Sequence, residues 1–554
     1  MAGEILTPNA IWHNFKIKNV GIVEVVEELN KDEINVKSSY ILGREVNGEQ
    51  IKIFTISSCT KDCDRKSAII IPSPLDKPID LAILEHFAKL GFFVLYVDVY
   101  GKKEEGHYTK YPESISYANY EEVKDKLKSV YKDAKSTCYY EWGGVLKYAY
   151  YYLKNVEGIK KIGCLGITLG ANPVWYLSAT EDVDACAFVI NGGWLAYNTM
   201  HKFSGRKEPQ FSDETYKYIA GIEPQSYASH IKCPTFIMGA TGNSKFDSDR
   251  IHDTLARIKE GVYAGGDFSV GYSDSISSDG LKNLDVFFQS YLGSRVKKLP
   301  ETPEIRCEII DKKLVYTVKT FGKEVEKVNL YVAEEMVAPE KRAYVRLEPV
   351  KSKGQEFVFE YIPYHGSLVA IAFSKVVYQS GFELSSNVIA KRFTKDEVLS
   401  RISKTKVIYS SAVEGEESIF YSLTSDNCGI DIFNNSKVVV KKGPMDIEGV
   451  YSPSGLRTSR IITKKDMPTD GSILMLDIYL PNGGDVEVCI TSGKYNTKYF
   501  ASVSLEKGKI WQNIKIEMNK FKTLEGKILK TYQECSEISF KISEEYLLNN
   551  ILWT

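Results

Sequence analysis

The chain has few of the features that mark secreted, membrane or nucleic-acid-binding proteins. Its 554 residues include only 10 cysteines and carry a formal net charge of -1. No apolar run reaches the ~18 residues of a membrane-spanning helix, and the opening MAGEILTPNAIWHNF lacks a basic segment followed by an apolar one. A nearly neutral chain also lacks the basic surface that polyanions require. We therefore expect a cytoplasmic protein without membrane or nucleic-acid partners.

Disulfide and metal chemistry have little support either. The cysteines are scattered along the chain, and Cys59 and Cys63 form the only close pair. Without a second pair or neighbouring histidines, these two residues make a poor zinc site. We therefore expect free or structural thiols, no metal and no cofactor.

The first 298 residues predict an α/β domain. A hairpin signal at Asn47-Gly48 is followed by continuous apolar strands, SAIIIPSP and FFVLYVDVYG, which alternate with helical segments such as IDLAILEHFAKLG. Such an order predicts a mostly parallel sheet with helices on both faces. Two insertions are expected, at about 102–136 and 195–225.

The remainder of the chain predicts two all-β domains. Residues 299–395 contain short strands divided by polar turns, which is typical of a small β-sandwich of the immunoglobulin-like kind. After a charged segment, residues 405–554 again alternate apolar and polar positions, as in SILMLDIYLP and DVEVCITSG. We expect a second sandwich there, with a jelly-roll arrangement.

The stretch KIGCLGITLGAN, residues 161–172, carries the most specific motif. It places Gly-x-hydroxyl-x-Gly between an apolar strand and a helix, which is the spacing of a nucleophile elbow. Thr168 stands at the apex, where a serine is usual, and the backbone N–H of Leu169 is the corresponding oxyanion donor. The extra methyl of threonine stiffens the side chain and crowds the turn.

With the order of elements around it, this motif resembles the α/β-hydrolase superfamily, in particular its dienelactone hydrolase and acetyl xylan esterase branch. The stretches AIIIPSPLDKPIDL, VDVYG and CPTFIMGATGN contribute to the resemblance. It implies ester hydrolysis by a nucleophile, an acid and a histidine that follows the last strand. Near the C-terminus, KGKIWQNIKIEMNKFKTLEGKIL resembles the jelly rolls of carbohydrate-binding modules, which implies a carbohydrate ligand.

The expected base is missing, because no histidine lies between residues 253 and 364. His201, in the second insertion, is the best substitute, and His107 is a weaker one. Asp247 is either the acid or the N-cap of the helix SDRIHDTLARI. A second oxyanion donor must come from Ser73 or Leu75, since the prolines on either side of Ser73 have no N–H.

Aromatic residues cluster around the predicted strand ends and insertions. They are more typical of core packing than of a ligand pocket, although rings with hydroxyl tips also suit sugars. In the last domain, Trp511 and Trp553 fall in strand patterns that favour core positions. The cluster in the first domain consists of Trp142, Trp175, Trp194, Tyr100, Tyr108, Tyr111, Tyr117 and Tyr197.

These patterns predict a protein of esterase ancestry with a degenerate triad, which binds a small ester-like or carbohydrate ligand with weak or no hydrolysis. Two alternatives remain open. One is an active carboxylic-ester hydrolase that uses Thr168 with a non-standard base, and the other is a structural or assembly protein. We also keep open a homo-oligomer formed through the β-sandwich domains.

Overall fold

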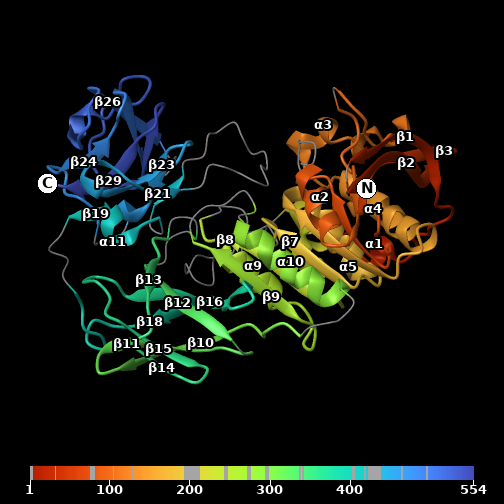
Figure 1. The fold of residues 1–554 in the computed structure, drawn as a ribbon, viewed down its shortest axis with the longest axis horizontal. Coiled ribbons are helices and arrows are strands. Elements are labelled where there is room, and N and C mark those ends of the chain that lie inside the picture. Colours follow the sequence, from red (N-terminus) through yellow and green to blue (C-terminus); the bar gives the residue numbers. More distant parts are fainter. Residues whose placement is uncertain are drawn as a thin grey trace.

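The structure is a computed structural model of the whole chain. It describes residues 4–31, 33–74, 81–103, 105–127, 129–192, 212–242, 247–270, 276, 278–293, 298–322, 324–335, 339, 342–401, 406–416, 419–421, 438–462, 466–493 and 497–554. The first part of the chain forms an α/β domain, and two β domains follow it (Figure 1).

A nine-stranded sheet organises the first domain, in the order β1-β2-β3-β5-β4-β6-β7-β8-β9. The first strands are antiparallel, and β5 also runs antiparallel to β3, whereas all neighbours from β5 to β9 are parallel. The apolar strands at the centre are buried on both faces, as the sequence predicts. The strands are β1 (Ile22–Lys31), β2 (Ile34–Val46), β3 (Glu49–Thr60), β4 (Ser67–Pro72), β5 (Phe93–Val97), β6 (Lys161–Ile167), β7 (Ala185–Val189), β8 (Thr235–Ala240) and β9 (Ala264–Ser269).

Helices cover both faces of this sheet. Buried side chains of α4, α5, α8 and α9 pack in the core on one face, and those of α2 and α10 pack in the core on the other. The hairpin prediction is confirmed, because Asn47 and Gly48 have φ of 51° and 86° in the turn between β2 and β3. The helices are α1 (Pro8–Trp12), α2 (Leu81–Lys89), α3 (Tyr120–Val123), α4 (Cys138–Asn155), α5 (Ala171–Thr180), α7 (Asp213–Gly221), α8 (Pro224–Ala228), α9 (Ser248–Leu255) and α10 (Ser278–Leu292).

The second domain consists of two antiparallel sheets, β10-β11-β15-β14 and β13-β12-β16-β17 with β18 beside β16, which fit a β-sandwich. Its core is continuous with the α2 and α10 side of the first domain. Phe236 of β8, for example, contacts Phe382 at a centroid distance of 5.3 Å. The strands are β10 (Glu304–Ile310), β11 (Lys313–Lys319), β12 (Val325–Glu334), β13 (Val345–Leu347), β14 (Lys351–Lys353), β15 (Glu356–Tyr361), β16 (Val369–Tyr378), β17 (Glu383–Ser385) and β18 (Ile389–Arg392).

The third domain also has two antiparallel sheets, β21-β22-β29-β24-β27 with β19 beside β29, and β20-β23-β28-β25-β26. They enclose a separate hydrophobic core. Its elements are β19 (Val407–Ser410), α11 (Ser411–Glu414), β20 (Phe420–Tyr421), β21 (Val439–Lys442), β22 (Glu448–Tyr451), β23 (Leu456–Thr458), β24 (Ile473–Tyr479), β25 (Gly484–Ser492), β26 (Thr497–Leu505), β27 (Gln512–Glu517), β28 (Cys535–Ile542) and β29 (Leu547–Trp553).

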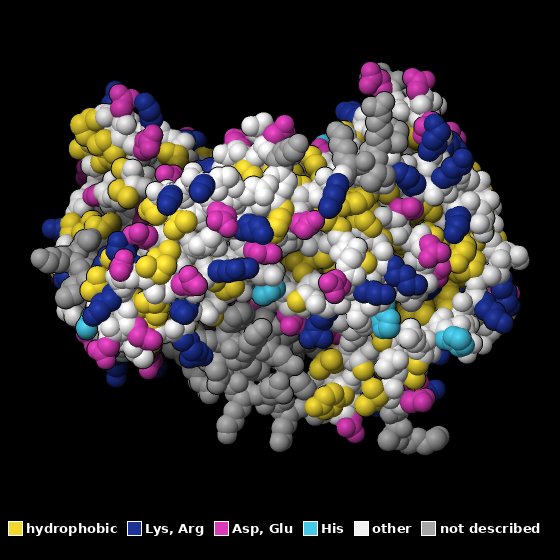
Figure 2. Space-filling model, turned by 90° about the horizontal axis from the view of Figure 1, so that it is seen from below, with side chains coloured by type: hydrophobic (Ala, Val, Ile, Leu, Met, Phe, Trp, Pro, Cys, Tyr) yellow, Lys and Arg dark blue, Asp and Glu magenta, His cyan; other side chains and the backbone are white. Residues whose placement is uncertain are grey.

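The surface agrees with the balanced composition. Figure 2 shows basic and acidic side chains interspersed over the face that it presents, so neither sign of charge dominates there. Within the described residues, no helix combines the length and the apolar character needed to cross a bilayer.

Candidate functional site: a nucleophile elbow with a threonine apex

The predicted elbow is formed in the structure. Thr168 follows β6 at once, has φ of 49°, and begins a single 3-10 turn that leads into α5. A positive φ is strained for a residue branched at Cβ, and such strain costs on the order of 1–3 kcal/mol. The turn at residue 168 therefore has the backbone geometry of a nucleophile elbow, with a side chain that suits it poorly.

The two glycines of the motif are required by close packing. A Cβ at Gly166 would lie 2.5 Å from Ala171 Cα, and one at Gly170 would overlap the carbonyl oxygen of Ser73. Because both obstacles are backbone atoms, neither can move aside cheaply. The two glycines are therefore a structural requirement of this strand-to-helix turn, whatever the residue at its apex.

A buried asparagine holds the elbow in place. Asn191, just after β7, donates from Nδ2 to the Thr168 carbonyl oxygen at 2.7 Å and to Asn172 Oδ1 at 2.8 Å. Its Oδ1 accepts a 3.2 Å hydrogen bond from Trp175 Nε1. The Thr168 hydroxyl, in contrast, is buried and has no hydrogen-bond partner among the residues that the structure describes. The backbone of the elbow is thus fixed, while no described group activates its hydroxyl.

The candidate oxyanion donors differ in their availability. Leu169 lies in the first turn after the apex, where backbone N–H groups lack intrahelical partners. The prediction for Ser73 is wrong, because its N–H donates to the Val97 carbonyl oxygen at 2.8 Å. Its hydroxyl accepts from Val99 N at 3.0 Å, so Ser73 closes the space between the ends of β4 and β5. Leu75 lies outside the described residues.

Asp247 is the N-cap of α9, as one of its two predicted roles required. Its Oδ1 accepts from the N–H groups of Asp249 and Arg250 at 3.0 and 3.1 Å. Its Oδ2 lies 3.4 Å from Arg250 Nε. This cap is not on the solvent side of the helix, because Asp247 is 1% exposed. Burial raises the pKa of its carboxyl to about 7, although the charge of Arg250 acts in the opposite direction.

The second domain contacts the same turn of α9. Arg342, shortly before β13, makes two hydrogen bonds of 2.7 and 2.8 Å to the carboxylate of Asp249 in α9. Lys375 of β16, which is partly buried, lies 2.9 Å from the buried Asp267 of β9. The sandwich therefore binds the first turn of α9 and the last strand of the sheet.

Among the histidines that the structure describes, His86 and His107 contact groups other than Thr168. His201, the predicted substitute, lies outside them, as do Asn243, Trp194 and Tyr197. His86 pairs with Asp285 on α10 at 2.7 Å, between two outer helices. His107 stacks on Phe54 at a centroid distance of 5.5 Å and lies 3.4 Å from the Tyr40 hydroxyl. Neither is brought to Thr168 by an observed hydrogen bond.

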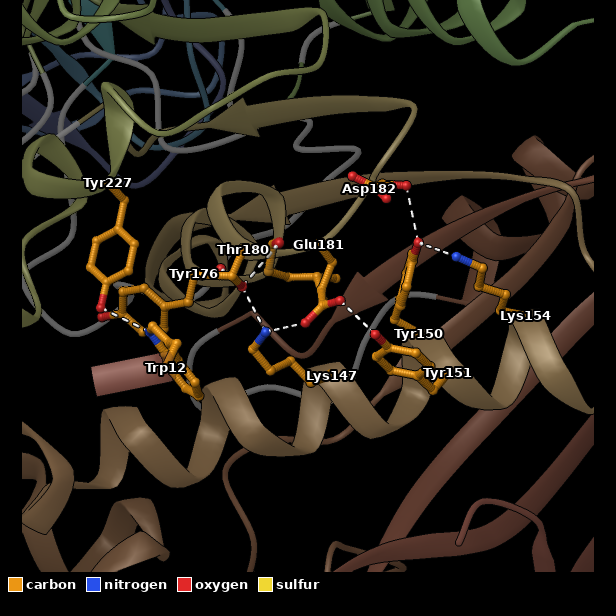
Figure 3. A network of polar contacts seen from close by, with 11 residues as sticks. Trp12, Lys147, Tyr150, Tyr151, Lys154, Tyr176, Thr180, Glu181, Asp182 and Tyr227 are labelled. Carbon is orange, nitrogen blue, oxygen red and sulfur yellow. Dashed lines mark hydrogen bonds and ion pairs between the residues drawn. The ribbon is translucent and has the colours of Figure 1, made fainter. Parts of the chain in front are cut away.

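The aromatic cluster is largely core, as expected. Trp142 and Trp175 are fully buried, and Trp175 stacks on Phe188 at 3.7 Å. Tyrosines also tie α4 to the end of α5, around a buried Lys147 that contacts Thr180 and Glu181 (Figure 3). Burial lowers the pKa of Lys147, while its contact with Glu181 opposes that shift. These groups stabilise the helical layer.

No described group of three or more His, Cys, Asp or Glu side chains could hold a metal ion.

Sequence reasoning missed Asn191 and Arg342. Asn191 follows an apolar strand, and a polar residue just after a parallel strand is a signal that could have marked it, because ligands bind at the carboxyl ends of such strands. Arg342 has no such signal, because its partner Asp249 lies 93 positions earlier in the chain.

No protein-family model and no curated protein sequence matches the chain. Similar solved structures include an acetyl xylan esterase from Paenibacillus sp. R4, at 12% identity and a TM-score of 0.35, which covers 48% of this chain and 85% of that one. Acetyl xylan esterase 1 from Thermoanaerobacterium sp. JW/SL YS485 has 13% identity and a TM-score of 0.35, with 49% and 89% covered.

A putative dienelactone hydrolase from Klebsiella pneumoniae subsp. pneumoniae MGH 78578 has 11% identity and a TM-score of 0.29, with 44% and 87% covered. At such low scores, the assignment of the fold has to rest on the chain itself. Its strand order, its helices on both faces and its elbow at Thr168 fit an α/β-hydrolase-like fold.

Proposed function

We propose that this chain is a protein of esterase ancestry that has lost its triad and binds a small ester-like or carbohydrate ligand with weak or no hydrolysis. The observation that carries this proposal is the role of Asp247, whose carboxylate caps α9 beneath the second domain. A threonine apex and the absence of histidine between residues 253 and 364 point the same way. Loss of a triad typically reduces turnover by about 10⁶, while an oxyanion site and binding retain about 10³–10⁴ over water.

Hydrolysis of an activated ester, 4-nitrophenyl acetate, tests this proposal. We expect the purified chain and its Thr168→Ala variant to release nitrophenolate at the same low rate, because any residual hydrolysis does not depend on the Thr168 hydroxyl. Thr168→Ser removes the methyl and keeps the hydroxyl, and we expect it to show the same rate, because no described group activates a hydroxyl at this position. Turnover by the wild-type chain that Thr168→Ala abolishes would contradict the proposal.

The main alternative is an active hydrolase in which Thr168 works with a base from an insertion. One observation favours this alternative. The strained turn at Thr168 holds a buried hydroxyl that has no hydrogen-bond partner among the described residues. Under this alternative, Thr168→Ala and His201→Ala each abolish ester turnover, whereas His86→Ala, which removes a histidine paired on the outer helices, does not. A purely structural role would leave all these variants inactive and would appear as oligomerisation in light scattering.

A carbohydrate ligand has a candidate surface in the third domain. Trp511 is half-buried on the outer face of the β24 and β27 sheet and not in the core, while Trp553 is buried as predicted. The Trp511 ring lies over Gly443 and Gly449 and 6.0 Å from the ring of Tyr479. An adjoining pair of aromatic rings on a sheet suits the flat apolar face of a sugar.

Polar groups lie in the next row of the same face. Asp477 accepts hydrogen bonds from Asn513 Nδ2 at 2.7 Å and from Asn550 Nδ2 at 2.9 Å, across three adjacent strands. Each oxygen of the carboxylate keeps a further lone pair, which a sugar hydroxyl can use. Rings with carboxylate and amide groups beside them are a combination that recognises saccharides.

Affinity electrophoresis of the full chain in gels of soluble polysaccharides tests this second candidate. We expect retardation that Trp511→Ala and Asp477→Ala remove. Tyr131→Ala is the matched control, since Tyr131 is an aromatic residue that is 73% exposed on the first domain. Retardation that survives both variants, or no retardation in xylan, mannan and glucan gels, would rule out this face as a carbohydrate site.

A further inference from the structure

A tight turn in the third domain presents a leucine to solvent. Residues 521–529 fold back shortly after β27, with Phe521 and Leu529 buried at the base in the core of the domain. Leu524, at the tip, is 90% exposed, and Ile528 is 45% exposed. Tips of tight turns usually carry Gly, Pro, Asn, Asp or Ser. Neither packing nor turn geometry therefore accounts for a leucine at this position.

Hydrogen bonds define the shape of this turn. At the base, Leu529 N–H donates to the Phe521 carbonyl oxygen at 2.9 Å. Nearer the tip, the N–H groups of Thr523 and Gly526 donate to the carbonyl oxygens of Lys527 and Thr523, each at 2.9 Å. Gly526 has a φ of 84°, a backbone conformation that glycine adopts without strain. The backbone therefore holds Leu524 in its exposed position.

The turn lies at an outer edge of the domain. β26 is the last strand of its sheet, and Lys522 joins it through two hydrogen bonds with the backbone of Phe500, of 2.8 and 3.0 Å. Figure 1 shows β26 on the side of the third domain that faces away from the other two domains. Trp511 belongs to the other sheet, which contains β24 and β27. The turn is thus distinct from the face that carries Trp511.

Lysines surround the exposed leucine. Residues 520–530 contain four lysines but only one acidic residue, Glu525. All four lysines are exposed, and none of them forms an ion pair with another described side chain. They are Lys520, Lys522, Lys527 and Lys530. The expectation of no membrane partner rests on the net charge of the whole chain, which does not reveal such a local cluster.

We propose that the turn at residues 520–530 docks the protein on an anionic lipid bilayer. Leu524 enters the boundary between headgroups and acyl chains, and the lysines bind the negatively charged headgroups around it. A protein partner fits this tip less well, because a standard protein interface uses about 20–30 residues on each side, more than one turn supplies. A nucleic acid or an acidic polysaccharide would use the lysines and leave the leucine without a role.

Co-sedimentation of the full-length protein with vesicles tests the docking. We expect binding to vesicles of phosphatidylcholine with about 30% phosphatidylserine, and little binding to phosphatidylcholine alone. Binding should weaken as the salt concentration rises, because salt screens the charge of the lysines. Equal binding to both kinds of vesicle, or binding to neither, would refute the proposal.

Two variants separate the contributions of the leucine and the lysines. Leu524→Ala should reduce the partition coefficient by at least roughly fivefold, since it withdraws apolar carbon atoms from the interface. Lys522→Gln/Lys527→Gln should reduce it by roughly 25-fold, or about fivefold for each lysine. Wild-type binding by Leu524→Ala would overturn the proposal, because the turn would then be a site for polyanions in general.

Matched controls come from the same chain. Val413 in α11 is 83% exposed and is followed by Glu414, without a lysine beside it. Lys351 and Lys353 are two exposed lysines on β14 of the second domain. Val413→Ala and Lys351→Gln/Lys353→Gln should therefore bind the anionic vesicles as wild type does. A loss in either control as large as that in its counterpart would show that binding is not specific to the turn and would contradict the proposal.

Insertion of the tip is measured with Leu524→Trp, which an exposed position accommodates without repacking of the core. Brominated acyl chains quench tryptophan on contact. In vesicles of brominated phosphatidylcholine and phosphatidylserine, we expect stronger quenching of Leu524→Trp than of the wild-type protein. Equal quenching of the two proteins, with Tm unchanged in solution, would refute the insertion of residue 524.

Discussion

The buried pair of Arg342 and Asp249 provides the most direct test of how the first two domains are joined. Their side chains are 2% and 0% exposed, and both N–H···O contacts are 2.7–2.8 Å long. Arg342→Met leaves the Asp249 carboxylate buried without its partner. Removing one member of such a pair typically costs about 3–5 kcal/mol, whereas replacing both members is nearly neutral. We therefore expect Arg342→Met/Asp249→Asn to be more stable than Arg342→Met alone.

Thermal unfolding followed by tryptophan fluorescence measures the effect. The first two domains share a core, so we treat them as one unit of about 400 residues, for which 1 kcal/mol corresponds to roughly 1.2 °C in Tm. Arg342→Met should then lower Tm by about 4–6 °C, and the double variant should recover most of it. Lys298→Met, at an ion pair that is 84% and 60% exposed, is the control and should shift Tm by less than about 1 °C. A decrease below 1 °C for Arg342→Met, or no recovery in the double variant, would refute the reasoning.

Two further predictions concern the segments around the elbow. Because Asp247 has a folded-state pKa near 7 against 3.8 for an ordinary carboxyl, the folded chain holds a proton that the unfolded chain releases as the pH rises from 4 to 7. Its contribution to stability is thus fully present below about pH 4 and is lost progressively as the pH rises to 7, by at most about 4 kcal/mol in total. Asp247→Asn keeps the capping oxygen and does not titrate, so its Tm should be close to that of wild type near pH 4 and should exceed it by a growing margin up to pH 8; a constant difference at both pH values would contradict this. Gly170→Ala should destabilise by about 1–3 kcal/mol, because its Cβ would overlap the Ser73 carbonyl oxygen, whereas Gly21→Ala meets nothing within 4 Å. Equal urea midpoints for these two alanine variants would show that the elbow tolerates a side chain at residue 170.

The architecture of the first domain was predictable because its signals are local. Continuous apolar strands such as residues 67–72 and 93–97 lie in the parallel part of the sheet, and CYYEWGGVLKYAYYYLKN is α4 from its first residue to its last. Burial on both faces selects such strands whatever their partners are. The position of Trp511 could not be predicted in the same way, because an alternating strand pattern leaves open which row of side chains faces the core.

The candidate site was only partly predictable. The elbow could be recognised because two glycines and a hydroxyl residue occupy fixed positions within five residues. The role of Ser73 could not, since its N–H bonds to Val97, which belongs to another strand. Asp247 remained ambiguous between acid and N-cap for the same reason: its surroundings come from a domain whose residues lie about a hundred positions later.

The sequence alone therefore determined the type of each domain, the sharp turn at Thr168 and the absence of a histidine between residues 253 and 364. These are properties of short segments, set by side-chain periodicity and backbone sterics. Only the tertiary structure decided that the second domain covers the first turn of α9 and that Asp247 is buried there as a cap. Contacts between Arg342 and Asp249 depend on how two domains pack, and packing is not encoded in any single stretch of the chain.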